Sequence, residues 1–376
     1  MQRVQKSENL LVEEIFGGRR KQSGEVGIEI EVEGRNLPQQ AHMREFWEVK
    51  RDGSLRGESA EYVLTQPVAR RNVSNALLYL DSVFTAVEAQ PNMSYRTSVH
   101  VHVNQQGMNF RTLITEMVLY YIFEESLVNF CGPERVGNKF CLRARDAEDI
   151  VRRVYEAVTG NHFHLMIEEN IKYAAMNINA LARFNSLEFR AMRGTLDQGV
   201  INKWVEMLLC IKDAATSGKF DSPTAVVARM SEMGPEEFTR YIFGEHADVI
   251  FEDREYKDHM YYGVRLVQEL AYGVRWNHTP EEQVSNGKKP KRNANLNNDA
   301  NILEAIQFNA RQVAEQQQRE REALNRFNGG QQPPAPPPQR FWDPEGAGNW
   351  NVEPVPVEDL DEPRDPVPNF DDDEDL

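Results

Sequence analysis

The stretch VGIEIEVEG, residues 26–34, alternates over eight positions between apolar side chains and acidic or small ones. Successive side chains of a strand point to opposite faces, so this segment predicts a strand with one apolar and one acidic face. The apolar face is formed by Val26, Ile28, Ile30 and Val32, and the other by Gly27, Glu29, Glu31 and Glu33. Glutamates in one row repel one another and are poor strand formers. The row is therefore either a solvated outer face or a face that holds a cation.

Two further segments repeat this design. In SVHVHVN, residues 98–104, three valines alternate with Ser98, His100, His102 and Asn104; in SLEFR, residues 186–190, Leu187 and Phe189 alternate with Ser186, Glu188 and Arg190. One such strand is more often a half-solvated sheet face than a site. Three of them favour one antiparallel sheet whose polar face is an active site. Its carboxylates and imidazoles suit Mg²⁺ or Mn²⁺, and its arginine suits phosphate, because the planar guanidinium binds two oxygens at once.

Composition limits the class of protein. The chain has 376 residues and a formal net charge of −16, enough for two domains or one large one. Residues 353–376 hold eleven acidic residues and one arginine, so this segment contributes −10 and the remainder about −6. The three cysteines have no metal-knuckle spacing, which favours reduced thiols. Without a membrane-length apolar run or a signal-peptide core, we expect a cytoplasmic protein with neither a membrane nor a direct nucleic-acid partner.

The pattern along the chain predicts a globular part followed by an extended tail. Helices are expected at about 70–88, 109–130 and 199–216 and within 222–275, and strands in AEYVLT, AAMNINAL and NSLEFRAM besides those above. The fold class is α+β, with a curved, mostly antiparallel sheet and helices on one face. The expected divisions are a flexible lead-in at 1–24, a catalytic domain with a helical C-terminal extension at 25–276, a linker at 277–298, a polar helix at 299–328, and a proline-rich, acidic, disordered tail at 329–376.

The order of these segments resembles the phage and bacterial amidoligases, a family of the carboxylate–amine ligase superfamily that also contains glutamine synthetase and glutamate–cysteine ligase. The similarity lies in GIEIE, RDGSL, AEYV, VHVHV, KYAAMNINAL and LEFRAMRGTLD, in that order, over about residues 25–215. GIEIE alone is weakly specific, whereas the ordered series is strongly so. The resemblance implies a glutamine-synthetase-like catalytic fold and an ATP- and Mg²⁺-dependent ligase. A substrate carboxylate would take the γ-phosphoryl group, and an amine would displace phosphate from the acyl phosphate. A phage-encoded protein would act in the host cytoplasm.

The resemblance also implies a set of metal ligands. It places Glu29 and Glu31 at the family's paired metal-binding glutamates, with Gly27 keeping that face open. Asp52, in RDGSL, would be a further ligand, or otherwise a turn residue. At the next acidic strand the family has a glutamate followed by Ser-Pro, whereas this chain has Thr-Gln-Pro one residue further on. Either Glu58 or Glu61 then binds the metal, and we favour Glu61.

The remaining roles fall on the other two strands and on the loops between them. His100 and Glu188 would complete the metal ligands, and the implied catalytic residues are His102, Glu188 and Arg190. Contacts with ATP are expected from His102, Arg190, Arg193 and Lys172, and Asn177 also matches the pattern. Three residues after the long predicted helix either reach a substrate carboxylate or carry surface charge: Arg135, Asn138 and Arg143.

Other functions and partners stay open at this level. A catalytically inactive binding or regulatory protein could share the fold, although the intact set of acids, histidines and arginine argues against it. A metal-dependent hydrolase is the third possibility, and Arg190 beside Glu188 favours ligation over it. The expected partners are small-molecule or peptide carboxylate and amine substrates. The acidic tail is a solubility tail, a docking segment for a protein partner such as a glutamine amidotransferase, or a cover for the site.

Overall fold

The computed structural model describes residues 8–17, 24–147, 149–160, 162–167, 172–274 and 276. The chain divides into two units, Met1–Ala294 and Asn295–Leu376, and every described residue belongs to the first. The linker, the polar helix and the acidic tail predicted from the sequence lie outside the described residues.

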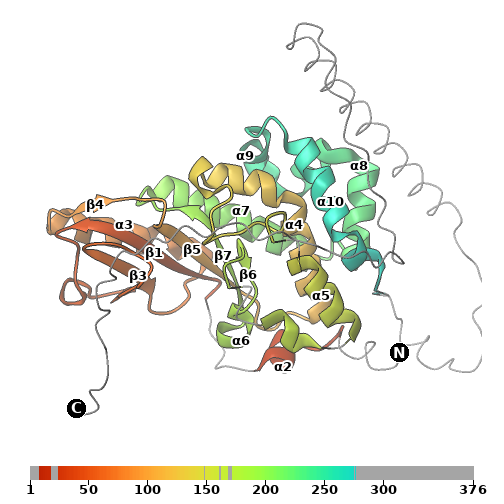
Figure 1. Cartoon of the computed structure of the whole chain (residues 1–376), viewed down its shortest axis with the longest axis horizontal. Helices are drawn as coiled ribbons and strands as arrows, with labels where there is room; N and C mark the ends of the chain where they lie inside the picture. The colour runs from red at the N-terminus through yellow and green to blue at the C-terminus, as the bar shows by residue number, and fades with distance from the viewer. Residues whose placement is uncertain are drawn as a thin grey trace, which may run out of the picture. The chain divides into compact units, whose positions relative to one another are not determined.

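The first unit is built on a seven-stranded antiparallel sheet (Figure 1). Its strand order is β2-β3-β1-β5-β7-β6, and the short β4 pairs with the end of β1. The strands are β1 Val26–Arg35, β2 Trp47–Lys50, β3 Ser59–Leu64, β4 Gln90–Asn92, β5 Ser98–Asn104, β6 Met176–Asn177 and β7 Ser186–Arg193. The predicted α+β class and antiparallel sheet are confirmed, and the acidic segment at 26–34 forms a central strand.

The apolar sides of the alternating segments face the core, as predicted. Eight side chains on these sides are at most 1% exposed: Val26, Ile28, Ile30, Val32, Val99, Val101, Leu187 and Phe189. Three helices cover this face of the sheet: α3 Val73–Ala86, α4 Phe110–Cys131 and α7 Gln198–Thr216. Helix α4 packs on β7 and α7 packs on β5. Helix α3 contacts the β2–β3 edge, where Trp47 Nε1 donates to the carbonyl oxygen of Ala76.

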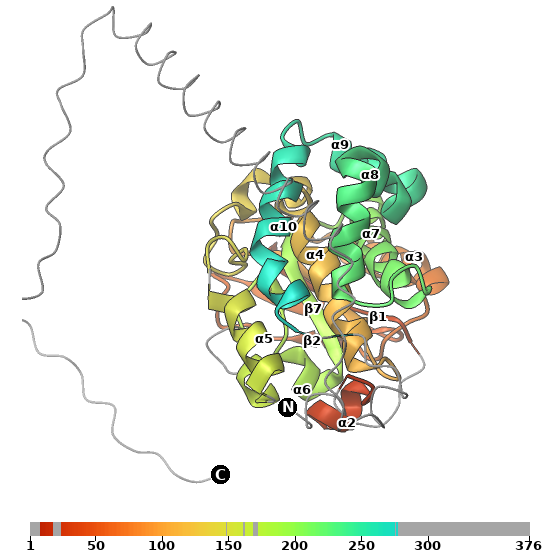
Figure 2. The same ribbon diagram turned by 90° about the vertical axis from the view of Figure 1, so that its right-hand side faces the viewer.

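A second layer of helices surrounds α4, which explains why this helix is apolar on nearly all sides (Figure 2). The layer contains α8 Pro223–Phe243 and α10 Tyr256–Tyr272, with the short α9 Asp248–Phe251 between them. Helix α8 begins at the Ser222 cap and is interrupted at Gly234, which precedes Pro235. Helix α5, Asp149–Gly160, packs against α10. The helices predicted within 222–275 are thus confirmed.

Two parts of the unit differ from the sequence prediction. Residues 8–17, assigned to a flexible lead-in, contain helix α2, Val12–Phe16, whose backbone is tied by Val12 N–H to Met108 O at 2.9 Å. Val12 and Phe16 are buried, so this part of the lead-in belongs to the folded unit. The strand expected in AAMNINAL is limited to β6, because α6, Ala180–Phe184, follows it in place of a simple turn.

A buried acid inside α4 gives the first test of the packing. Glu116 accepts a hydrogen bond at Oε1 from Gln105 Nε2 (2.9 Å), and Oε2 is buried without a partner in the described part of the chain. Burial outweighs the attraction of Lys212 and raises the pKa of Glu116 from 4.5 to about 7. The folded state therefore holds this proton more tightly than the unfolded chain. The resulting stabilisation is complete below pH 4.5 and is lost as the pH rises through 7.

Glu116→Gln is expected to remove this loss, because the amide stays neutral at every pH. The free energy of unfolding of the wild type should fall, relative to that of the variant, by roughly 1–3 kcal/mol between about pH 5 and about pH 8. Urea denaturation at the two pH values measures this. Glu269→Gln, at an exposed position of α10, is the control and should follow the wild type. Parallel curves for wild type and Glu116→Gln would contradict the prediction.

Candidate metal centre

The polar face of the sheet gathers the side chains that the sequence distributes over separate strands. In the strand register Glu29 of β1 lies opposite His100 of β5, and His102 lies opposite Glu188 of β7. On the other side of β1, Glu31 lies opposite Glu61 of β3. The side chains also meet: Nδ1 of His100 is 3.3 Å from Oε2 of Glu29 and 3.5 Å from Oε1 of Glu188. Glu29, His100 and Glu188 therefore share one face, as predicted.

Negative charge is in excess at this place. Five acidic side chains meet here: Glu29, Glu31, Asp52, Glu61 and Glu188. Among the described residues, their ion pairs come from His100, His102 and Arg190. Glu31 and Glu188 are only 3% and 6% exposed. A buried carboxylate needs a counter-charge, so the cluster favours binding of a cation.

The hydrogen bonds of His100 determine where its proton lies. Ser98 donates its hydroxyl hydrogen to Glu31, so the serine oxygen accepts from Nε2 of His100, 2.7 Å away. In the neutral ring Nε2 is then the protonated nitrogen, and Nδ1 is an acceptor. This Nδ1 faces the carboxylates of Glu29 and Glu188, which are acceptors themselves. Three acceptors therefore face one another: His100 Nδ1 and the carboxylates of Glu29 and Glu188. A cation between them, either a proton or a metal ion, would stabilise this arrangement.

His102 closes the cluster on its β7 side. Nδ1 of its ring is 3.0 Å from Ser186 Oγ, and Nε2 is 3.5 Å from Oε1 of Glu29. A Cβ atom at Gly27, which lies opposite, would be 3.3 Å from Cβ of His102, so glycine leaves room at this position. Burial favours the neutral ring, but the hydrogen bond that the ring donates to Glu29 and the charge of Glu188 prevail and raise the pKa of His102.

The carboxyl groups of the cluster titrate in opposite directions. Burial opposes ionisation of Glu29, but its contacts with the rings of His100 and His102 outweigh it and hold the pKa of Glu29 well below 4.5. Glu188 behaves likewise: burial is outweighed by the charges of Arg190 and the histidines, and its pKa is lowered. For Glu61, burial and the charges of Glu29, Glu31 and Asp52 act together and raise the pKa to about 8. The excess negative charge is therefore greatest around Glu61.

Three overlapping groups of side chains could each hold a cation, with ligand atoms within 4.8 Å of one another. They are Glu29 with Glu61 and His100, Glu29 with His102 and Glu188, and Glu31 with Asp52 and Glu61. Oxygen ligands with a single imidazole suit Mg²⁺ or Mn²⁺ better than soft metals. Glu58 is exposed and belongs to none of these groups of described residues, which favours Glu61 as the ligand.

Arg190 is brought to the cluster from its β7 edge. Its Nη1 pairs with Oε1 of Glu188, and its Nε donates to the carbonyl oxygen of Phe140, 3.3 Å away. The other carboxylate oxygen of Glu188 accepts from Asn177 Nδ2 at 2.6 Å. Glu188 is thus held from two sides, with the guanidinium beside it. A fixed guanidinium next to a cation site suits a phosphate group.

A bulge in β7 sets the direction of Arg190. After Phe189 the register shifts, so that Arg190 and Ala191 lie opposite His100. Met192 then returns to the apolar face and is fully buried. The strand can therefore place Arg190 on the polar face without exposing Met192.

Arg135 holds this bulge from outside the sheet. It lies in η3, Pro133–Arg135, and its Nε and Nη2 donate to the carbonyl oxygens of Ala191 (3.0 Å) and Arg190 (2.8 Å). A bulge leaves backbone groups without a strand partner, and the guanidinium satisfies two of them. The sequence offered Arg135 as a substrate ligand or a surface charge. Both interpretations are wrong, because the side chain has no exposed surface.

Two residues predicted to contact ATP, Arg193 and Lys172, make other contacts in the structure. Arg193 directs Nη1 to the carbonyl oxygens of Phe130 (3.3 Å) and Cys131 (3.1 Å), at the C-terminal end of α4. Lys172 is exposed, and its Nζ lies 5.2 Å from the ring centroid of its neighbour Tyr173. Neither cation makes an ion pair with another described residue.

The other two candidate substrate ligands after α4, Asn138 and Arg143, make contacts within the folded unit. Arg143 is nearly buried and pairs with Glu125 and Asp146, so it is not a free substrate ligand. Asn138 donates to the carbonyl oxygens of Tyr95 and Glu134.

The sequence analysis named three polar residues around the centre but did not assign them a supporting role. Ser98 and Ser186 each bond a histidine of the cluster, and Asn177 bonds Glu188. Such partners orient metal ligands and fix histidine tautomers. The two serines lie on the polar side of the alternating segments, and this position was the feature of the sequence that could have indicated their role.

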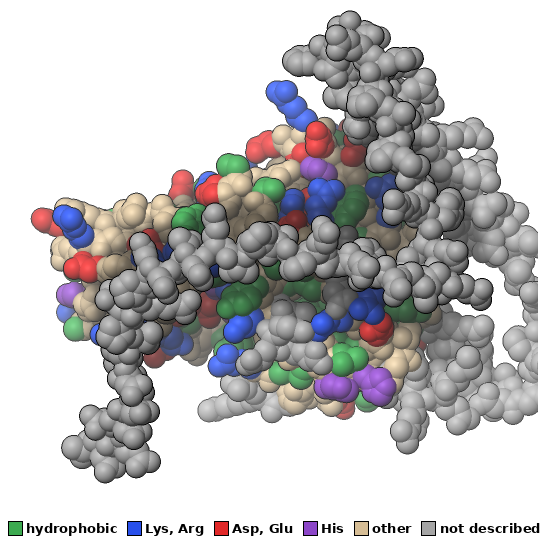
Figure 3. Space-filling view, viewed as in Figure 1, with side chains coloured by type: hydrophobic (Ala, Val, Ile, Leu, Met, Phe, Trp, Pro, Cys, Tyr) green, Lys and Arg blue, Asp and Glu red, His purple; other side chains and the backbone are tan. Residues whose placement is uncertain are grey.

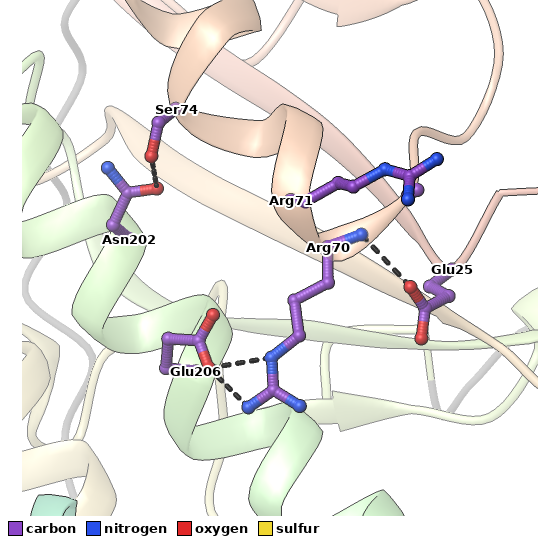
Figure 4. A pocket seen from close by; sticks show the side chains of 7 residues that line it. Glu25, Arg70, Arg71, Ser74, Asn202 and Glu206 are labelled. Carbon is purple, nitrogen blue, oxygen red and sulfur yellow. Dashed lines mark hydrogen bonds and ion pairs between the residues drawn. The ribbon is translucent and has the colours of Figure 1, made fainter.

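An open pocket on another part of the unit provides a contrast (Figure 4). It lies between η2, Arg70–Asn72, the start of α3 and helix α7, and is lined by Glu25, Ala69, Arg70, Arg71, Ser74, Asn202 and Glu206. Arg70 pairs with Glu206 and Asp213. Because these opposite charges are already paired, the pocket lacks the charge excess of the candidate metal centre.

No protein-family model matches the chain, and a search among curated proteins finds no match either. Within the described ranges, no helix combines the length and the apolar character needed to cross a membrane. The functional interpretation therefore depends on the geometry of the centre and on the order of its residues along the chain.

Proposed function

We propose that the protein is an ATP- and Mg²⁺-dependent carboxylate–amine ligase with a glutamine-synthetase-like catalytic fold. Support comes from paired acids on a central strand, two histidines on the next strand, and a glutamate–arginine pair on the strand after that. The amidoligase pattern has these residues in the same order. Phosphoryl transfer needs positioning and charge neutralisation, and acids that hold cations beside an arginine can provide both.

The position of His100 is the strongest support for a metal at this place. Its Nδ1 lies between the carboxylates of Glu29 and Glu188, and its Nε2 is committed to Ser98. A histidine held in this way presents one nitrogen to a cation together with oxygen ligands. A solvated outer sheet face, the alternative for the acidic row, would leave its acids exposed, whereas Glu31 and Glu188 are buried.

Each residue has a task in the proposed reaction. Glu29, Glu31, Asp52, Glu61, His100 and Glu188 would hold the cations, and bound Mg²⁺ would neutralise charge on the ATP phosphates. His102 would donate to a phosphate oxygen, and Arg190 would neutralise the γ-phosphoryl group during transfer. A substrate carboxylate oxygen attacks the γ-phosphorus as ADP leaves. The amine nitrogen then attacks the acyl carbon, and the products are phosphate, a proton and the amide.

The decisive experiment is ATP turnover with defined co-substrates. The protein should release ADP when a carboxylate and an amine are both supplied, with a condensation product in the mass spectrum. A pool of small molecules and peptides from a cell lysate supplies candidates for both. ADP release with water alone would indicate a hydrolase, and Mg²⁺-ATP binding without turnover would indicate an inactive binding protein.

Binding of Mg²⁺ should release protons below about pH 8. The metal-free protein holds a proton on Glu61, whose pKa is about 8, and a metal ligand must be deprotonated. The affinity for Mg²⁺ should therefore rise with pH and level off above about 8. Calorimetric titrations in two buffers with different ionisation enthalpies measure the protons released per cation.

Matched variants assign this proton. Glu61→Gln should abolish most of the release and weaken binding. Glu58→Gln removes an exposed acid three positions earlier and should change neither. The reverse pattern would show that Glu58 is the ligand.

A further inference from the structure

An aromatic rim borders the candidate metal centre on its β7 side. We define it as Tyr95, Phe140 and Tyr173. The carbonyl oxygen of Phe140 accepts from Nε of Arg190, so the rim is joined directly to the centre. The Phe140 and Tyr173 ring centroids are 6.3 Å apart, and Tyr95 and Tyr173 are 57% and 41% exposed. Over the middle of the face in Figure 3, hydrophobic side chains lie next to Lys and Arg side chains.

Arg96 is held in a fixed position within this rim. Its guanidinium carbon lies 5.2 Å from the ring centroid of Tyr95 and 5.8 Å from that of Phe140. Its Nη1 donates to the carbonyl oxygen of Ser54 (3.0 Å), whose N–H in turn bonds Asp52 Oδ1 (2.5 Å). The guanidinium thus connects the loop that carries a candidate metal ligand with the loop that supports Arg190. Contact with two rings and a backbone carbonyl reduces its freedom before any ligand binds.

The donors of Arg96 are largely unused. Of its five N–H groups, one bonds Ser54, and no carboxylate of a described residue pairs with it. Two further cations that make no ion pair with a described residue contact the rings of the rim: Lys139 Nζ is 5.0 Å from the Phe140 ring, and Lys172 Nζ is 5.2 Å from the Tyr173 ring. The rim is therefore basic, next to a centre that is strongly acidic. Such an arrangement suits a ligand of which one part reaches the proposed cations of the centre and another part carries a negative charge that contacts the rim.

We infer that Arg96 binds an oxyanion of the substrate, whose planar or apolar body lies on the rings of Tyr95 and Phe140. The oxyanion is a carboxylate or a phosphate that does not itself react. That the ligand is a substrate rests on the proposed ligase function, whereas the anion site rests on the contacts of Arg96. A planar guanidinium binds two oxygens of either group in the same way, and aromatic rings add contact area at low entropic cost.

The test uses small probes and requires no turnover. The probes are benzoate, phenyl phosphate and uncharged benzyl alcohol, titrated into the full chain by ligand-observed NMR, once with Mg²⁺ and once with a chelator. Wild type should bind at least one anion more tightly than the alcohol. Arg96→Gln should weaken that anion at least about 10-fold, the effect of losing hydrogen bonds to a charged group. Arg96→Lys keeps the charge but loses the planar fork, so its affinity for the anion should lie between those of the wild type and of Arg96→Gln.

A remote arginine provides the matched control. Arg265 on α10 also lies over an aromatic ring, with Cζ 5.9 Å from the centroid of Tyr262, and Arg265→Gln should leave probe binding unchanged. The anion that binds more tightly assigns the site to carboxylate or to phosphate. Equal binding of charged and uncharged probes, no detectable binding of either anion, or wild-type binding by folded Arg96→Gln would overturn the inference. Failure of Mg²⁺ to bind, or absence of turnover, would count against the proposed function alone.

Discussion

Glu29→Gln should reduce Mg²⁺-dependent ATP turnover by more than roughly 100-fold. Glu29 belongs to two of the three candidate ligand groups and contacts both histidines of the centre. Glutamine has the same size, but it carries no charge, and its amide nitrogen cannot ligate a hard cation. Initial rates of ADP release at saturating Mg²⁺ and co-substrates measure the effect. A variant that keeps a rate near that of wild type would refute the metal centre.

Glu33→Gln is the matched control on the same strand and face. Glu33 is buried like its neighbours, but it belongs to none of the ligand groups found among the described residues. Its Oε1 accepts from the N–H of Arg56 at 2.8 Å, a bond that a glutamine oxygen can also make. Turnover should therefore stay within a few-fold of wild type. An equal loss at Glu33 would mean that the effect at Glu29 is structural.

Stability measurements separate lost chemistry from lost folding. The folded state favours the ionised form of Glu29, so its contribution is present above the unfolded pKa of 4.5 and is lost as the pH falls. Glu29→Gln should then lower the free energy of unfolding at neutral pH without cations. Glu61 is the opposite case, because its pKa is raised, and Glu61→Gln should raise that free energy. A variant that is more stable and yet less active cannot owe its defect to unfolding.

Arg190→Lys should also cost roughly 100-fold or more in turnover, although it keeps the positive charge. The guanidinium pairs with Glu188 and donates to Phe140 O at the same time, which leaves its position fixed beside the candidate cation sites. A lysine presents a single ammonium group and cannot reproduce this geometry. The loss should appear in the rate at saturating ATP, while Mg²⁺ affinity should change little. A loss confined to Mg²⁺ affinity would mean that Arg190 only supports Glu188.

Arg193→Lys gives the comparison on the same strand. The guanidinium of Arg193 lies on carbonyl oxygens at the end of α4 rather than at the carboxylates. We expect turnover within a few-fold of wild type and a small decrease in thermal stability. A large loss of turnover with normal Mg²⁺ binding would support the role in ATP binding that the family pattern implies for this residue.

Alternation in the sequence was sufficient to predict the two faces of β1 and β5, and of β7 as far as Arg190. It depends on a two-residue period, and this period fails where β7 bulges. Phe189 and Met192 are three positions apart and both buried, so strict alternation would have directed Met192 toward the polar face. The bulge carbonyls are satisfied by Arg135, 55 residues before Arg190. No local pattern predicts a partner at such a distance.

The sequence also treats the acids as equivalent, whereas the structure separates them. Glu29 is paired with two histidines and Glu61 is surrounded by other acids, so one pKa falls and the other rises. This difference depends on the order of the strands, which alternation does not contain. Arg96 was missed for a related reason, because it precedes the alternating segment and reaches the centre through loop contacts.

The long separations along the chain between neighbouring strands have a consequence during synthesis. Glu29 and His100 are 71 residues apart, and His102 and Ser186 are 84 residues apart. A nascent chain therefore cannot complete the ligand set until β7 has left the ribosome, and pairings this distant form slowly. A cation that binds only the finished sheet stabilises it by mass action, by about 2.7 kcal/mol at a hundred times its Kd. For the newly made protein, a cation at the candidate metal centre would act first as a ligand that favours completion of the fold.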